Sequence, residues 1–279
     1  MSEIAIIAQT IMPQIHICKK GKIRTYKEGQ NRAINIFLIG TIVISTFSLM
    51  MLDIDWMKIL SRTPNIGITF YKLSQLSFKN FDYTIISFLQ TISITILATI
   101  YSVVIGIVLG ALASENIVKN RFVTITMKSF FTFLRAVPTP VWVLLALVCI
   151  GLGPSAGIIG LSVHAIAFFA KAFSQSFECV PSEVIEALEV TGANKLQIFA
   201  AAILPAAASQ IVAWTGLRFE INFSESAILG MVGAGGIGFA ITTNIQGYNY
   251  GVAGLAILMV FIFAYLIELL FTTIKKKYI

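Results

Sequence analysis

The sequence contains few charged residues and very few residues that could do chemistry. Only 12% of its 279 residues are charged, whereas 57% are hydrophobic, and the mean hydropathy is +0.87. A soluble domain carries roughly a quarter charged residues and needs them to cover its surface. The composition therefore excludes an ordinary soluble enzyme and indicates a protein that resides in a lipid bilayer.

The scarcity of reactive side chains excludes most catalytic and metal sites. Three scattered cysteines, Cys18, Cys149 and Cys179, predict neither a disulfide framework nor a metal cluster. The two histidines, His16 and His164, have no nucleophile and carboxylate at a recognisable spacing. The sequence also lacks a GxxxxGK[ST] loop for nucleotide phosphates. If the protein depends on ATP, another chain must bind the nucleotide.

Apolar segments of about 20 residues can cross the roughly 30 Å of bilayer hydrocarbon as helices. The sequence predicts about six such spans, over residues 33–52, 84–113, 136–152, 156–173, 206–231 and 251–271. The third contains Pro138 and Pro140, and the fourth contains His164. We interpret His164 as a packing residue rather than a proton relay. The predicted fold class is an all-α membrane protein.

Lysine and arginine are concentrated on one side of this topology. Most of them fall in four segments, 1–32, 114–128, 171–205 and 272–279. The opposite side carries Lys58, Arg62, Lys72 and Lys79. The positive-inside rule therefore predicts that both termini are cytoplasmic. Because the charges lie at membrane edges, the net charge of +7 does not indicate nucleic-acid binding.

Two segments flank the first span. Residues 1–32 place their basic cluster after a broken apolar stretch, unlike a cleavable signal, and are compatible with an interfacial arm or a disordered one. Residues 53–82 mix both charge signs with aromatic residues. We interpret them as a linker between spans, with contact to a partner as the alternative.

The glycine run VGAGGIG matches the GxGxxG pattern without the context of a dinucleotide site. That motif needs a preceding strand and an acidic residue about 20 positions later. Here a predicted span precedes the run, and the residues near position 258 are apolar. We expect the glycines to let the chain turn at the outer membrane surface, through positive φ angles and close helix contact. They are Gly233, Gly235, Gly236 and Gly238.

Residues 182–205 are too polar to cross a membrane and show a helical pattern. Ser182 is a predicted N-cap, and Glu183 is placed favourably in the first helical turn. Gly192 is a stop signal for this helix. A second helix is expected from about Asn194 until Pro205 interrupts it. The segment therefore predicts a short helical hairpin in the cytosol.

The run EALEVTG at 186–192, with LP at 204–205, resembles the EAA loop of binding-protein-dependent ABC importer permeases. The matching positions are Glu186, Ala187, Gly192, Leu204 and Pro205. Leu188 and Ala202 depart from the usual pattern, and both are apolar. The resemblance implies a type I ABC importer transmembrane domain in which this loop is a coupling helix seated on a partner ATPase.

Four further runs are similar to phosphonate-type permeases: RFEIN, SAILGMVGAGGIGFAI, RAVPTPVW and GLGPSAG. The resemblance covers residues 75–275, although Ser224 and Glu225 follow RFEIN where relatives usually have an arginine. It implies a permease core over 84–279 with the coupling loop at 182–205, preceded by the arm at 1–32 and a first helix with an outer loop at 33–83. The implied cargo is a small anion, phosphonate or a related phosphorus oxyanion.

The predicted fifth span is polar in its middle. Arg218, Asn222 and Glu225 stand at i, i+4 and i+7 on one helix face, with Glu220 on a neighbouring stripe. Charges at such depth normally face a protein interior or a watery cavity. The guanidinium can bind an oxyanion in the translocation pathway, or it can pair with a carboxylate to lock helices together. Both interpretations remain open from the sequence.

The resemblance also implies the partners. They are a dimer of cytosolic ABC ATPases that binds ATP and Mg²⁺, an extracytoplasmic solute-binding protein, a second permease copy or paralogue, and lipid of the bacterial cytoplasmic membrane. No cofactor or metal is expected in this chain. The alternatives are an ion-coupled secondary transporter that uses Glu220 and Glu225, a permease for an unrelated small solute, and a lipid-directed membrane enzyme.

Overall fold

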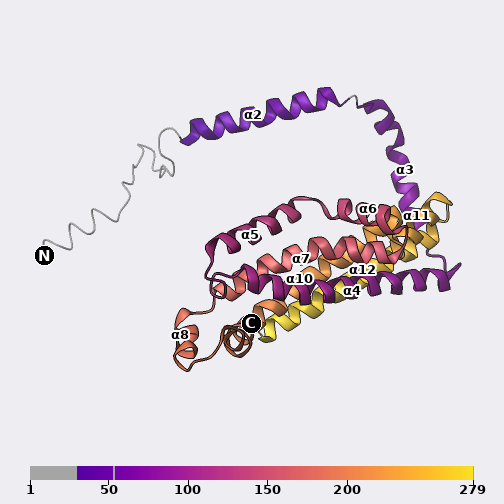
Figure 1. The fold of residues 1–279 in the computed structure, drawn as a ribbon. Helices are drawn as coiled ribbons and strands as arrows, with labels where there is room; N and C mark the ends of the chain where they lie inside the picture. The colour runs from indigo at the N-terminus through magenta and orange to yellow at the C-terminus, as the bar shows by residue number, and fades with distance from the viewer. Residues whose placement is uncertain (1–29, 53, 279) are drawn as a thin grey trace, which may run out of the picture. The chain divides into compact units, whose positions relative to one another are not determined.

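The computed structural model describes residues 30–52 and 54–278, and all regular elements in these ranges are helical (Figure 1). Except for its last three residues, the predicted N-terminal arm lies outside the described residues. In chain order the elements are α2 (Gln30–Met51), α3 (Trp56–Ser74), α4 (Phe81–Ala113), α5 (Arg121–Ala136), α6 (Thr139–Ile150), α7 (Pro154–Glu178), α8 (Ser182–Val190), α9 (Lys195–Ile198), η1 (Phe199–Ile203), α10 (Leu204–Leu229), η2 (Gly230–Ala234), α11 (Ile237–Gln246) and α12 (Tyr250–Tyr278).

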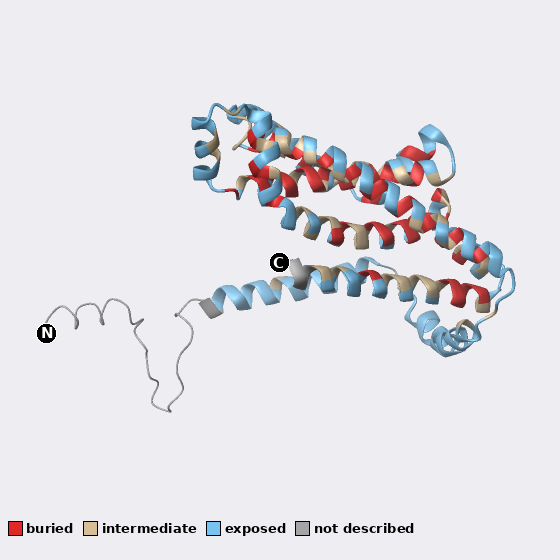
Figure 2. Cartoon of the chain, turned by 90° about the horizontal axis from the view of Figure 1, so that it is seen from below, coloured by how far each residue is buried: buried red, intermediate tan, exposed pale blue. Residues whose placement is uncertain are grey.

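The chain divides into two units, residues 1–65 and residues 66–279. In the first unit, α2 is apolar and exposed along almost its whole length (Figure 2). Its segment Arg32–Met51 is long and apolar enough to cross a membrane. The helix therefore has the properties of a single span whose side chains face lipid or another chain.

In the second unit, α7 packs against α4, α5, α6 and α10. Phe169, Phe173 and Phe177 recur every four residues on one face of α7 and are fully buried. Their ring centroids follow one another at 5.1 and 6.5 Å. This aromatic row forms the core of one half of the bundle, and Leu161 lies in a second buried cluster nearer the other end.

Glycines allow the neighbouring helices to approach α7 closely. A Cβ atom on Gly160 of α7 would overlap the main chain of Val143 on α6. A Cβ atom on Gly106 of α4 would overlap the side chain of Phe169. The hydrophobic effect does not drive helices together within lipid. Close van der Waals contact at small residues therefore holds membrane helices together.

A stripe of hydroxyl side chains follows the buried face of α4. Thr91, Thr95, Thr99 and Ser102 are at most 4% exposed. Each donates a hydrogen bond of 2.6 to 3.2 Å to the carbonyl oxygen four residues earlier in the same helix. These hydroxyls are satisfied by their own helix, so the face can be buried without matching polar groups opposite each one.

The third predicted span differs from the structure. α5 begins at Arg121, inside a segment predicted to be a cytoplasmic connection, and its axis makes an angle of 85° with that of α6. Val137 between them is extended, with φ −80° and ψ 123°, the conformation that a following proline imposes. The 12-residue α6 is too short to cross a membrane alone. A single span over 136–152 is therefore wrong, and only the bent pair can cross.

The other five predicted spans are confirmed as helices long and apolar enough to cross a membrane. They are the spans in α2, α4, α7, α10 and α12. The predicted outer linker at 53–82 contains the helix α3, which is not predicted from the sequence. Asp55 caps its start, since its Oδ1 accepts the backbone N–H of Lys58 at 2.9 Å.

We expect Gly160→Ala to lower the free energy of unfolding by about 1–3 kcal/mol, because the added methyl group must push the α6 main chain away. Gly40→Ala in α2 is the matched control, since the described part of the chain leaves open space there. The control should be neutral or stabilising by up to about 1 kcal/mol. Unfolding of both variants in detergent micelles tests this, and equal stability of the two would contradict the packing account.

Candidate functional site

The helical hairpin predicted at 182–205 projects from the end of the bundle opposite α11 (Figure 1). Every residue of α8 is exposed or half-buried. Glu186 and Ala187 are exposed, whereas Ile185 and Leu188 pack against the core beneath them. Leu188, which departs from the EAA pattern, therefore belongs to the inner face of α8. The matching pair Glu186 and Ala187 faces outward and is free to contact another protein.

The turn after α8 depends on Gly192. Its φ is +83°, a conformation that residues with a side chain rarely adopt. Its N–H donates to the carbonyl oxygen of Glu189 at 3.0 Å and so closes the end of the helix. Asn194 then begins α9 with a reciprocal cap, in which the side chain of each of Asn194 and Gln197 accepts the backbone N–H of the other at 2.9 and 2.8 Å.

The start of α8 differs from the prediction. Ser182 is the first helical residue, and Pro181 occupies the N-cap position with φ −56° and ψ 138°. A proline cannot donate an N–H, and its fixed φ suits a helix start. The prediction of Ser182 as N-cap is therefore wrong, whereas Glu183 does lie in the first turn.

The connection between α4 and α5 supports the hairpin from the side. Lys195 Nζ donates to the carbonyl oxygen of Ile117 at 3.3 Å, and Lys119 Nζ lies 3.6 Å from Glu189 Oε1. Asn116 Nδ2 donates to the carbonyl oxygen of Phe177 at 3.0 Å. Exposed pairs of this kind contribute little stability. They do fix where the hairpin sits relative to the end of α7.

Pro205 does not end the second helix of the hairpin, contrary to the prediction. A proline lacks the N–H that would bond to the carbonyl four residues earlier. The π-helical turn η1 precedes it, and the N–H of Leu204 reaches the carbonyl oxygen of Phe199, five residues back. This wider turn accommodates the proline. The helical run consequently continues from Lys195 to Ala234, through the whole of α10.

Arg218 of α10 lies at the centre of a buried polar cluster. It is 3% exposed, and its Nη2 donates to Glu225 Oε2 at 3.0 Å. The same Nη2 lies 3.1 Å from Nδ1 of His164 on α7. Because a guanidinium only donates, this Nδ1 must act as the acceptor. Glu225 Oε1 in turn accepts from Thr139 Oγ1 of α6 at 3.2 Å. The guanidinium and its carboxylate partner thereby connect α10 to α7 and α6.

Phe168 of α7 brings a second arginine to this cluster. The guanidinium carbon atoms of Arg135 and Arg218 lie 5.3 and 5.6 Å from the centroid of its ring. Both distances allow a cation–π interaction. Arg135 stands at the end of α5, just before the bend to α6. The bend therefore places a cation beside the cluster that is already centred on Arg218.

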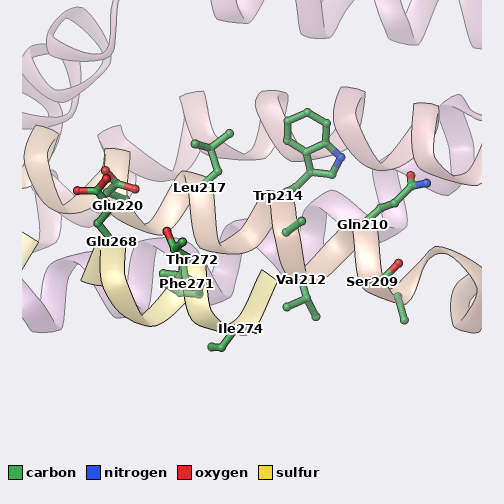
Figure 3. Close-up of a pocket in the computed structure, with 12 residues that line it drawn as sticks. Ser209, Gln210, Val212, Trp214, Leu217, Glu220, Glu268, Phe271, Thr272 and Ile274 are labelled. Carbon is green, nitrogen blue, oxygen red and sulfur yellow. The ribbon is translucent and has the colours of Figure 1, made fainter. Parts of the chain in front are cut away.

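The other two predicted pathway residues point elsewhere. Asn222 Nδ2 donates to Thr99 Oγ1 of α4 at 3.0 Å, so it joins α10 to α4. Glu220 of α10 and Glu268 of α12 both line a cavity of about 790 Å³ between these two helices (Figure 3). The predicted group of four therefore separates into the Arg218–Glu225 pair and two residues with different surroundings.

Three buried polar atoms in this part of α10 have no hydrogen-bond partner within residues 30–52 and 54–278. They are Arg218 Nε, Asn222 Oδ1 and Ser226 Oγ. A donor, an acceptor and a hydroxyl group left in this way suit a bound water or a polar solute. In the same ranges, no three His, Cys, Asp or Glu side chains are grouped so that they could hold a metal ion.

The glycine run at 233–238 combines two structural roles. Gly233, Gly235 and Gly236 have φ angles of +108°, +77° and +76°. Gly238 instead contacts α10, where a Cβ atom would overlap the carbonyl oxygen of Ala227. The N–H of Gly153 donates to the carbonyl oxygen of Gly233 at 3.1 Å, so this turn meets the turn between α6 and α7.

The sequence does not identify the contacts of three members of these networks. His164, interpreted as a satisfied packing residue, has Arg218 as its partner. Thr139 and Thr99, which the sequence does not single out, both contact the polar middle of α10. The signal available was the presence of a polar residue in an apolar span, which by itself identifies a buried polar contact but not its partner.

Within residues 30–52 and 54–278, five helices are long and apolar enough to cross a membrane, or six if the bent pair α5 and α6 counts as one span. Together with the buried ion pair and the exposed hairpin, they indicate a multi-pass membrane protein. The family described as binding-protein-dependent transport system inner membrane component matches residues 102–278. The chain belongs to this family.

Relatives with described roles resemble different parts of the chain. The phosphate-import permease protein PhnE of Mycolicibacterium smegmatis is 30% identical over 188 residues, which are 67% of this chain and 35% of that protein. The phosphite transport system permease protein PtxC of Stutzerimonas stutzeri is 24% identical, with 86% of this chain and 87% of that protein covered. The chain thus spans about a third of the first relative's length and most of the second's.

Solved structures support the fold. One chain of the inward-facing MetNI methionine ABC transporter superposes with a TM-score of 0.64 at 24% identity, covering 73% of this chain and all of that one. A crystal structure of an amino acid ABC transporter with histidines gives a TM-score of 0.55 at 20% identity, with 81% of this chain and all of that one covered. The fold is that of a type I ABC importer permease, as the sequence predicted.

We expect Arg218→Met to lower the free energy of unfolding by about 2–3 kcal/mol, because it leaves Glu225 in a half-buried site without its cation. The double variant Arg218→Met with Glu225→Gln should lose less than the sum of the single losses, by about 1–3 kcal/mol. Unfolding in detergent micelles measures this cycle. Glu220→Gln is the matched control on the same helix and should be additive with Arg218→Met. Additivity at Glu225 as well would show that the pair does not stabilise the bundle.

Proposed function

We propose that this chain is a transmembrane subunit of a binding-protein-dependent ABC importer and forms part of the path for a small phosphorus oxyanion. The observation that carries the proposal is the exposed α8, which presents Glu186 and Ala187 at the end of the bundle in a member of the transport family. An exposed amphipathic helix held on a rigid core is suited to docking in a groove of another protein.

Continuity of the helix supports a mechanical role for this hairpin. The helical run that begins at Lys195 passes through η1 and includes Arg218 and Glu225. When partner ATPases bind ATP and close, α8 would move with them, and α10 would carry the displacement to the polar cluster. ATP and Mg²⁺ would be bound by those ATPases, and this chain would supply motion and a path. It would itself hold no cofactor.

The charge distribution supports an orientation in the bacterial cytoplasmic membrane. Lys119, Lys128 and Lys195 lie at the same end of the bundle as the hairpin. The positive-inside rule assigns this end to the cytosol, with both termini on the same side. A solute-binding protein would then deliver cargo at the opposite end, where the glycine turns lie. A second copy of the chain or a paralogue would complete the pathway.

The choice of cargo follows from the relatives and from the Arg218 cluster. Relatives are named for phosphate, phosphite, D-methionine and glycine betaine transport. A phosphorus oxyanion fits a pathway with Arg218 and Arg135 close to one aromatic ring. In this structure Arg218 is already paired with Glu225, which favours a locking role for it in this state. Cargo selection would then reside mainly in the binding protein.

We expect Glu186→Lys and Gly192→Val to uncouple ATP hydrolysis from transport while the chain still inserts in the membrane. The first reverses the charge on the outward face of α8, and the second places a β-branched residue at φ +83° and redirects the hairpin. Uptake and ATPase activity of the reconstituted importer measure the effect. Asp82→Lys, an equal charge change at the exposed start of α4, is the control. Normal uptake by both hairpin variants would refute the docking role.

We expect phosphonate, phosphite or phosphate to raise the melting temperature of the partner solute-binding protein, because a ligand stabilises the folded state that binds it. Methionine and glycine betaine should leave it unchanged. A thermal melt with each compound distinguishes the two cargo classes. Protection by glycine betaine or methionine alone would assign the importer to an unrelated small solute and leave the permease role intact.

A further inference from the structure

The helix α3 has a polar face that is basic and carries no acidic residue. Six of its polar residues recur at three- and four-residue intervals and fall within an arc of about 100° on a helical projection. They are Lys58, Ser61, Arg62, Asn65, Thr69 and Lys72, and they include every charged residue of the helix. A helix with a single-sign polar face of this kind matches an anionic surface rather than plain solvent.

The rest of the α3 circumference is mainly apolar and aromatic, and its polar residues, Thr63 and Ser74, are uncharged. Trp56, Leu60, Phe70 and Tyr71 are 62%, 73%, 69% and 65% exposed. Along the helix, residues 56–72 are all exposed, and only Leu73 near the end is half-buried. Exposed apolar area of this extent on a helix marks a surface that contacts something other than water.

Topology and charge exclude α3 as a further span. If α3 crossed the membrane, Arg62 would lie near the bilayer centre at a cost of about 2.5–3.5 kcal/mol, whereas Lys58 and Lys72 would lie near the two ends of the span. A crossing by α3 would also reverse α4, which would place the basic hairpin end on the opposite side from the basic residues before α2. The helix therefore stays on the side of the membrane where α2 ends and α4 begins.

Short connections keep α3 at the membrane surface. Four residues, 52–55, join it to α2, and six residues, 75–80, join it to α4. Fully extended, these reach only about 14 and 21 Å. Both neighbours are candidate membrane spans. The near ends of α3 are thus tethered close to the points where two spans leave the bilayer.

We propose that α3 lies flat in this membrane interface, with its apolar face among the acyl chains and Lys58, Arg62 and Lys72 toward anionic phospholipid headgroups. Trp56 and Tyr71 are residues enriched at that depth. Lys72 also lies 5.7 Å from the ring centroid of Tyr250 at the start of α12. The proposal concerns residues before the family match at 102–278 and does not rest on the proposed transport function.

Spin labels on the full chain test the location. With Cys18, Cys149 and Cys179 replaced by serine, single cysteines at Leu60 and Phe70 report the apolar face, and those at Ser61 and Thr69 report the polar face. In vesicles of phosphatidylethanolamine and phosphatidylglycerol, we expect the first pair to relax with oxygen and the second with a water-soluble nickel complex. The two labels of each pair should lie at equal depth.

Each alternative gives a different result. Nickel accessibility at all four positions would place α3 in water, and a steady change of depth along the helix would make it a span. Immobile labels on the apolar face that neither reagent reaches would assign that face to a protein partner. Any of these results overturns the proposal, and none of them bears on transport by the permease core.

A charge series tests the headgroup contact. We expect the Leu60 label to lie deeper in phosphatidylglycerol vesicles than in phosphatidylcholine vesicles, because basic residues are drawn to an anionic surface. Lys58→Gln with Arg62→Gln should abolish that difference, whereas Lys79→Gln, a basic residue outside α3, should retain it. Equal depth in both lipids for the unmodified helix would refute recognition of anionic lipid.

Discussion

The close approach of α7 to its neighbours is the constraint on which the rest of the bundle depends. Gly160 and Gly106 remove the side chains that would keep α6 and α4 at a distance, and without them the helices would lose the contact area that holds them in lipid. On a further side, α7 packs against α10, where Nδ1 of His164 lies 3.1 Å from Nη2 of Arg218. The exposed hairpin projects from the end of α7. The polar cluster and the hairpin are therefore both positioned by one tightly packed helix.

The ion pair between Arg218 and Glu225 shows how a membrane protein holds a charge in a span. An isolated guanidinium at that depth is costly, and the cost is offset here by a carboxylate, an imidazole acceptor and an aromatic ring. The imidazole and the ring come from α7, the carboxylate comes from α10 itself, and Thr139 of α6 donates to that carboxylate. A shift of α6 or α7 relative to α10 would therefore change the surroundings of the ion pair.

Hydropathy predicted five of the spans because length and apolarity are properties of a single helix. The bend between α5 and α6 was missed because Val137 and Pro138 are as apolar as a continuous span, and the extended backbone shows only in three dimensions. The sequence predicts that Pro205 ends a helix. The helix continues instead, because the π-helical turn before Pro205 accommodates a residue without an N–H donor. The periodicity correctly predicts that Arg218, Asn222 and Glu225 share one face of a helix. Only the positions of α4 and α7 decide that Asn222 contacts Thr99 and Arg218 contacts His164.

The row of buried hydroxyl groups on α4 affects how easily α7 can move along α4. Thr91, Thr95, Thr99 and Ser102 all donate to carbonyl groups of α4 itself, and Ser102 adds one long contact of 3.4 Å to the carbonyl oxygen of Ser162 on α7. A translation of α7 along this surface would break few directional bonds and would mainly exchange one set of van der Waals contacts for another. The interface therefore combines close packing with few directional bonds, so that van der Waals contact is the main barrier to relative movement of α4 and α7.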